Sequence, residues 1–168
     1  KSSLLRAGLL PALTKSGAVE GIALWRYCLI RPSEGSSPVD ALVGGLLSET
    51  ALPELAAVTT ATQLAEAFRT TPEKAQTPIR TALATAAKEA NVEPRLARLV
   101  IAVDQVEELF TAEGTDQGAR EGFVHLLAAL AGSGFVWVVG TIRADFFHRC
   151  GEVPGFSALK DGLGSYEL

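Results

Sequence analysis

The chain has 168 residues, 48% of them hydrophobic, and a formal net charge of −4. Its length suits one domain with a sizeable core, and its mixed, mildly acidic charge argues against broad nucleic-acid binding. No apolar run reaches the roughly 18 residues of a membrane span, and no signal peptide is visible. The two cysteines, Cys28 and Cys150, form neither a disulfide framework nor a metal site, and predict reduced thiols in a cytoplasmic protein.

The first half of the chain contains a predicted helix, strand and second helix. Residues 2–13 predict a helix because leucines recur at helical spacing, and Pro11 is expected to disturb or end it. Residues 23–30 are rich in aromatic and branched side chains, which favours a strand. A loop rich in Pro, Ser and Gly over residues 31–38 then leads into a helix over residues 39–47.

The second half continues the alternation of helices and strands. Residues 99–103 are an uninterrupted apolar run, which is typical of a strand buried on both faces. The other predicted elements are helices over 62–68, 78–90, 118–130 and 144–149, a buried strand over 135–142, and a short edge strand over 165–168. This alternation predicts βα units with a parallel sheet, so the expected fold class is α/β.

Three carboxylates follow the apolar run at 99–103, namely Asp104, Glu107 and Glu108. Ligands of open α/β sheets bind just beyond the carboxyl ends of such strands, and in nucleotide hydrolases an Asp there holds Mg²⁺. We therefore interpret residues 99–108 as a Walker B element with Asp104 as the metal ligand. Glu107 or Glu108 could orient and polarise the attacking water, or both acids could instead charge the first turn of a following helix.

The first residues match the end of the phosphate-loop pattern G-x-x-x-x-G-K-[ST], with Lys1 and Ser2 in its last two positions. The Lys ammonium would reach the β- and γ-phosphates, and the Ser hydroxyl would ligate Mg²⁺ at a helix N-terminus. A Lys-Ser pair alone is also typical of a solvated terminus. Combined with Asp104 it predicts a phosphate site, and Ser3 is assigned to the same nucleotide-binding group.

Thr141 and Arg143 lie at the end of the second buried strand, which we expect beside the strand that carries the acids. A hydroxyl and a cation at that position could sense the γ-phosphate, and an Arg also stabilises the charge on a transferring phosphoryl group. The alternative is that Arg143 pairs with Asp145 or with the acids at 107 and 108.

Three blocks of the chain resemble the novel STAND NTPases, which are signal-transduction ATPases with numerous domains. Residues 1–13 are similar to the helix that follows the family's phosphate loop. Residues 104–111 look like the family's D-Q-x-E-E-L-F-T Walker B block, and residues 139–147 contain its R-A-D-F sensor segment. The blocks occur in the family's order, whereas residues 48–97 contribute little to the resemblance.

The resemblance implies a three-layer P-loop NTPase with a parallel sheet, of which residues 1–168 form a single, incomplete domain. The chain begins with Lys1 and contains no Met, so we expect an excerpt or a processed product, truncated within the Walker A motif. It would then lack the first, phosphate-loop strand, which would lie beside the strand over 135–142. We expect such a chain to bind ATP weakly by itself.

The resemblance also implies function. ATP and Mg²⁺ would be the cofactors, held by Lys1, Ser2 and Asp104, with Arg143 as the sensor. Such modules hydrolyse ATP slowly, form homo-oligomers on activation, and in bacteria are fused to sensor and effector domains. We therefore expect an ATP-binding and hydrolysing switch, with two alternatives: a non-hydrolysing nucleotide-binding oligomerisation module, and an unrelated α/β domain whose acids only cap helices. The choice of ATP over GTP stays open.

Overall fold

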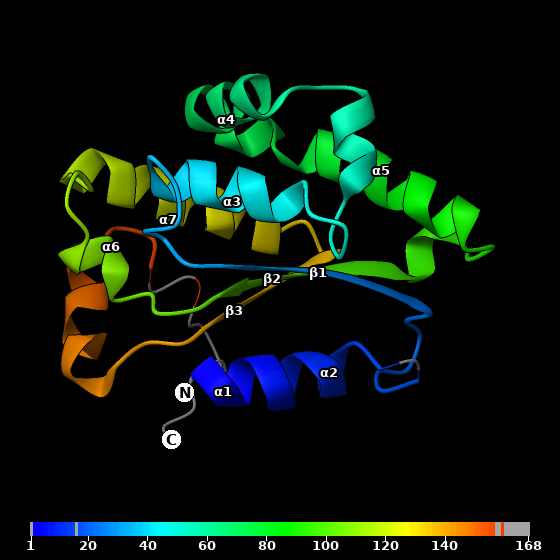
Figure 1. Ribbon diagram of the computed structural model, residues 1–168, viewed down its shortest axis with the longest axis horizontal. Helices are drawn as coiled ribbons and strands as arrows, with labels where there is room; N and C mark the ends of the chain where they lie inside the picture. Colours follow the sequence, from blue (N-terminus) through cyan, green and yellow to red (C-terminus); the bar gives the residue numbers. More distant parts are fainter. Residues whose placement is uncertain (1, 16, 157–158, 160–168) are drawn as a thin grey trace.

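The computed structural model describes residues 2–15, 17–156 and 159, and in this part of the chain three parallel strands form one sheet between two layers of helices (Figure 1). Lys1 and the edge strand expected over residues 165–168 lie outside the described residues. The strands are β1 (Leu24–Ile30), β2 (Ala97–Val103) and β3 (Val136–Gly140), in the order β1-β2-β3. The predicted α/β class with a parallel sheet is confirmed.

The register of the sheet brings the carboxyl ends of all three strands to one edge. Ile30 lies opposite Val103, and Val103 lies opposite Gly140. Strand β2 is central, and each of its residues is buried except Arg98, which is half-buried. This burial confirms the prediction from the uninterrupted apolar run, because a central strand covered on both faces has no solvent-facing side.

One face of the sheet is covered by a thick layer of helices. Serine, threonine and aspartate side chains cap three of them: Ser37 accepts from the Asp40 amide, Thr60 forms a capping box with Gln63, and Asp116 accepts from an amide of the first turn. The elements of this layer are α3 (Pro38–Leu46), η2 (Pro53–Ala57), α4 (Ala61–Thr70), η3 (Pro72–Lys74), α5 (Gln76–Glu89), η4 (Pro94–Leu96) and α7 (Gln117–Ala131), of which η2, η3 and η4 are short 3₁₀ helices. The predicted helices over 39–47, 62–68, 78–90 and 118–130 are therefore confirmed to within a few residues.

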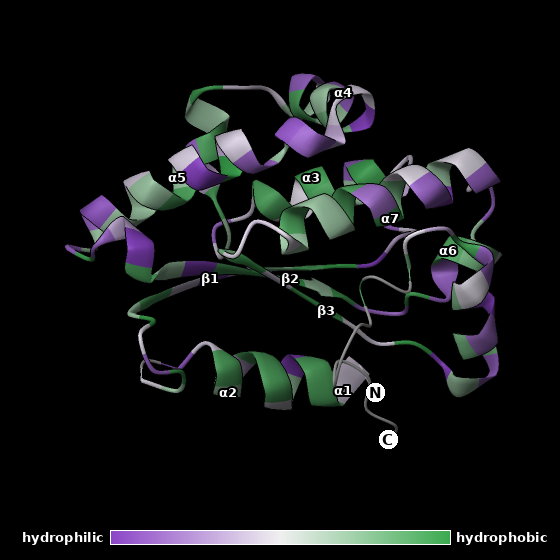
Figure 2. Cartoon of the chain, turned by 180° about the vertical axis from the view of Figure 1, so that it is seen from behind, coloured by the Kyte–Doolittle hydropathy of each residue, from purple (hydrophilic) through white to green (hydrophobic). Residues whose placement is uncertain are grey.

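The opposite face is covered by the N-terminal helical segment, which runs through α1 (Ser2–Leu4), a π-helical turn η1 (Leu5–Leu9) and α2 (Leu10–Leu13). Figure 2 shows this segment as mainly hydrophobic. Leu5 and Leu10 are buried against Val100 and Ala102 of β2. The disturbance of the helix that we expected at Pro11 appears as the π-helical turn η1 just before it, because the proline ring nitrogen has no N–H to donate. The helix then ends at Leu13.

Two short helices follow the carboxyl edge of the sheet. They are α6 (Glu108–Thr111) after β2, and η5 (Ala144–Glu152) after β3. The helix predicted over 144–149 is thus of the 3₁₀ type and extends further, and the strand predicted over 135–142 is shorter at both ends. Among the described residues, no helix combines the length and the hydrophobicity needed to cross a membrane.

Candidate nucleotide site

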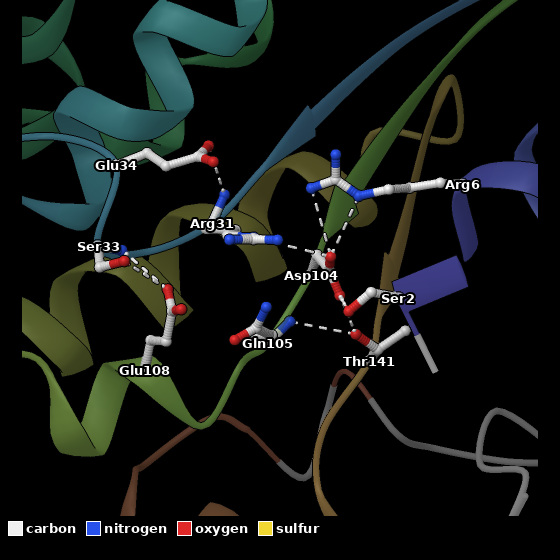
Figure 3. Close-up of polar contacts among 9 residues, drawn as sticks. All are labelled: Ser2, Arg6, Arg31, Ser33, Glu34, Asp104, Gln105, Glu108 and Thr141. Atoms are coloured by element: carbon white, nitrogen blue, oxygen red, sulfur yellow. Dashed lines mark hydrogen bonds and ion pairs between the residues drawn. The ribbon is translucent and has the colours of Figure 1, made fainter. Parts of the chain in front are cut away.

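Three separate segments meet at Asp104, the first residue after β2. Its backbone amide donates to the carbonyl oxygen of Ile30 at 2.8 Å, which fixes the strand end beside β1. Its carboxylate is fully buried, and one oxygen, Oδ1, accepts from the hydroxyls of Ser2 at 2.8 Å and Thr141 at 2.7 Å (Figure 3). Ser2 lies 102 positions before Asp104 in the chain and Thr141 lies 37 positions after it, and both are joined to its carboxylate.

The environment of Asp104 keeps its carboxyl charged. Burial by itself raises the pKa of Asp104, but hydrogen bonds from Thr141, Ser2 and Arg6, together with the positive charge of Arg6, outweigh it and hold the pKa below its ordinary value. A carboxylate that is buried and yet ionised is suited to bind a cation, because the folded protein has already removed it from bulk water.

Two arginines complete the surroundings of Asp104, and sequence reasoning did not select either of them. Nε and Nη2 of Arg6 lie 3.4 and 3.5 Å from Oδ2 of Asp104, and Nε of Arg31 lies 3.9 Å from the same oxygen. Arg6 follows Ser2 by four positions, which is the spacing that places two side chains on one face of a helix. Arg31 follows β1 directly, as Asp104 follows β2, so the parallel register could have suggested the pair.

The turn after Asp104 is built on Gln105, which has a positive φ of 57° although it is not a glycine. This conformation is costly for an L-residue and occurs mainly at sites where the surroundings impose it. Here the Gln105 amide donates to Oγ1 of Thr141 at 3.1 Å, and the Val106 amide donates to the Thr141 carbonyl oxygen at 2.8 Å. The turn therefore joins the ends of β2 and β3.

Glu107 and Glu108 lie in different environments. Glu107 is buried, and its Oε2 accepts from the backbone amide of Arg143 at 3.2 Å. Glu108 is the first residue of α6, and its Oε2 accepts from the amide of Ser33 at 3.2 Å and from the Ser33 hydroxyl at 2.7 Å. Glu108 thus occupies the helix start that the capping alternative required, and Ser33 is a second residue of the β1–α3 loop that sequence reasoning missed.

The side chain of Arg143 pairs with a neighbouring carboxylate. Its Nε and Nη2 donate to the carboxylate of Asp145 at 3.1 and 2.9 Å, and the side chain is 65% exposed. This is the alternative partner that the sequence suggested. Among the predicted site residues, the structure therefore brings Ser2, Thr141 and Asp104 together, while Ser3 is exposed on α1.

The donor set at Asp104 fits a magnesium ion that binds together with phosphate. Carboxylate and hydroxyl oxygens are the ligands that Mg²⁺ accepts, and it is usually held by one or two carboxylates plus substrate phosphates. In the described part of the chain, no group of three or more His, Cys, Asp or Glu residues could hold a metal by itself. A metal at this carboxylate would therefore depend on a phosphate ligand.

A parallel α/β sheet with a buried Asp at a central strand end, facing a Ser from a helix N-terminus, is the arrangement expected of P-loop NTPases. Residues 1–165 match the family model described as Novel STAND NTPase 1. The chain belongs to this family, which confirms the resemblance. No curated protein and no solved structure matches the chain.

Proposed function

We propose that this chain is the nucleotide-binding and hydrolysing switch module of a multidomain signal-transduction protein, and that its nucleotide is ATP with Mg²⁺. The single observation that carries the proposal is the convergence of the Ser2 and Thr141 hydroxyls on the buried carboxylate of Asp104. These residues come from three separate segments, and burial of a charge is costly, which supports a ligand-binding role for this carboxylate.

In this proposal Lys1 and Ser3 would bind the phosphates together with Ser2, at the N-terminus of the first helix, where amide groups favour anions. Mg²⁺ would neutralise charge on the phosphate oxygens. Ser2 and Asp104 would hold the metal, and Thr141 would keep Asp104 oriented through its short hydrogen bond.

The hydrolytic step would need a carboxylate near the attacking water. Glu108 fits this role better than Glu107, because Glu108 is half-buried and accepts from Ser33, whereas Glu107 is buried and bound to the Arg143 amide. Arg143 would have to exchange its Asp145 partner for a phosphoryl oxygen to act as a sensor.

The test is the Asp104→Asn variant of the purified full-length protein, measured for Mg²⁺-dependent binding of a fluorescent ATP analogue and for phosphate release. We expect a loss of about tenfold or more in both, because a metal ligand and its charge are removed. Asp116→Asn is the matched control, since Asn caps a helix as well as Asp does and Asp116 lies at the start of α7. Equal binding by the two variants would contradict the proposal.

One observation favours the non-hydrolysing oligomerisation module as a second candidate. Both acids that could act on water already have hydrogen-bond donors, Ser33 for Glu108 and the Arg143 amide for Glu107. In such a module ATP would lock the fold and promote a homo-oligomer without turnover. The candidates separate in a Glu108→Gln variant: phosphate release falls if the module hydrolyses ATP, and stays at background if it does not, while ATP-dependent mass by light scattering reports oligomerisation.

The remaining features of the proposal concern the whole protein. We propose a cytoplasmic location, which the two unpaired cysteines support, and, from the family's general behaviour, a homo-oligomer on activation and fused sensor and effector domains. Competition of GTP against the fluorescent ATP analogue tests the choice of nucleotide.

A further inference from the structure

Arg6 and Arg31 approach the same oxygen of Asp104 from two sides of the carboxyl edge (Figure 3). Arg6 belongs to the N-terminal helical segment, and Arg31 is the residue that follows β1. Their contacts are 3.4 to 3.9 Å long, compared with 2.7 to 2.8 Å for the two hydroxyls on the other oxygen. The arginines are therefore the loosely held partners of this carboxylate.

Both arginines have room to change partners. The side chain of Arg6 is 45% exposed and that of Arg31 is 36% exposed, so each guanidinium can move without entering the core. In addition, Nε of Arg31 is a buried donor without a hydrogen-bond partner among the described residues. A buried donor in this state costs free energy, and an anionic oxygen beside it would remove that cost.

The charges at this point disfavour a free metal ion. One carboxylate and two guanidiniums are net positive before any cation arrives, and a divalent cation at Oδ2 would have to displace both arginines or lie beside them. A polyphosphate changes this balance because it supplies several negative oxygens, which guanidinium groups bind well, often through two hydrogen bonds.

We propose that Arg6 and Arg31 neutralise Asp104 in the nucleotide-free protein and bind the polyphosphate when nucleotide enters, so that a divalent cation binds at Asp104 only together with nucleotide. The inference rests on the proposed nucleotide site and adds to it two phosphate-binding residues and an order of binding. Its consequence is that the free protein does not hold Mg²⁺ at Asp104, although the carboxylate is ionised.

The experiment measures binding of Mn²⁺, a paramagnetic substitute for Mg²⁺, to the purified full-length protein with and without ADP, by electron paramagnetic resonance. The Mn²⁺ binding that the wild type shows and the Asp104→Asn variant lacks is assigned to Asp104. For the wild type we expect weak Mn²⁺ binding that ADP strengthens. In the double variant Arg6→Gln, Arg31→Gln, Mn²⁺ alone should bind about fivefold tighter or more, and the strengthening by ADP should fall by a similar factor.

Two further variants keep the result interpretable. Arg95→Gln is the matched control, because Arg95 is 78% exposed, pairs with Glu93, and lies before the amino end of β2, whereas Asp104 follows its carboxyl end. Arg6→Lys retains the positive charge, so it should keep the order of binding while lowering the affinity for ADP. If the double variant fails to fold, as judged by thermal unfolding, the single Arg31→Gln variant should show the same changes to a lesser degree.

The outcomes separate this inference from the function on which it rests. A wild type that binds neither ADP nor Mn²⁺ with ADP overturns both. A wild type that binds ADP, but binds Mn²⁺ equally well without it, overturns only the order of binding. The order of binding is also overturned if the arginine variants lose affinity for ADP without binding Mn²⁺ alone more tightly. The two guanidiniums would then not compete with the metal.

Discussion

The carboxyl edge of the sheet and the helical cover, defined as residues 53–89, bury different kinds of side chain. Among the described residues, the buried charged side chains are Asp104 and Glu107, and both lie at the carboxyl edge. The helical cover buries only apolar side chains, such as Leu64, Phe68 and Ile79. Its threonines Thr70, Thr81 and Thr85 bond to carbonyl oxygens one turn earlier in the same helix.

This difference separates stability from function within one small domain. Burial of apolar surface in the helical cover stabilises the fold without burying a whole charged side chain, although one oxygen of Glu54 is buried without a hydrogen-bond partner among the described residues. At the carboxyl edge the chain accepts the cost of burying charge, and only long-range partners such as Ser2 and Thr141 offset it. Changes in the cover should therefore lower stability, and changes at the edge should alter ligand binding.

The largest expected effect on stability comes from Phe68→Ala in the cover. Phe68 is 2% exposed within the main core, and removal of a buried aromatic ring costs about 3–5 kcal/mol of unfolding free energy. Urea unfolding measures the loss. Val58→Ala is the control, because Val58 is apolar but 73% exposed and should change stability little. A Phe68→Ala protein that stays as stable as the wild type, or loses nucleotide affinity while still folded, would break the comparison.

A smaller effect is expected for Thr60→Ala, which removes the side-chain half of the capping box of α4. The Thr60 hydroxyl accepts from the Gln63 amide, and loss of such a cap costs about 1 kcal/mol. Thr59→Ala is the control, since Thr59 is the neighbouring residue and caps no helix. Chemical denaturation should distinguish the two variants, and equal midpoints would show that the cap contributes nothing to the cover.

The smallest effect concerns pH and the carboxyl edge. Because the folded protein lowers the pKa of Asp104 below its ordinary value of 3.8, the ionised carboxylate contributes stability above that pH and loses it as the pH falls through the folded pKa. The stability difference between the wild type and Asp104→Asn should shrink as the pH is lowered below about 4. The effect is small because burial opposes the hydrogen bonds. A difference that grows in acid would contradict the direction of the shift.

Sequence reasoning found the site residues that a known motif or the end of a buried apolar strand marks, and it missed the two arginines. Asp104 and Thr141 were predictable because each follows an apolar strand, and parallel strands end at one edge. Arg6 carries no such pattern, because its role depends on how the N-terminal helical segment packs over β2. Arg31 follows β1 directly, and the register of the sheet could have indicated it. The sequence offered Arg143 as a partner of Glu107 or Glu108, and the structure shows its backbone amide, rather than its side chain, at Glu107. Ser33 as the partner of Glu108 was not predicted.

The sequence by itself determined the α/β class, the central buried strand and the family. These properties follow from local features: an apolar run, helical periodicity and three motif blocks in order. The tertiary structure decided which polar groups share a carboxylate. It joined Ser2 and Thr141 to one oxygen of Asp104 and two arginines to the other. The physical reason is that hydrogen bonds and ion pairs act over a few ångströms. The number of residues between two segments does not tell how far apart the fold places them.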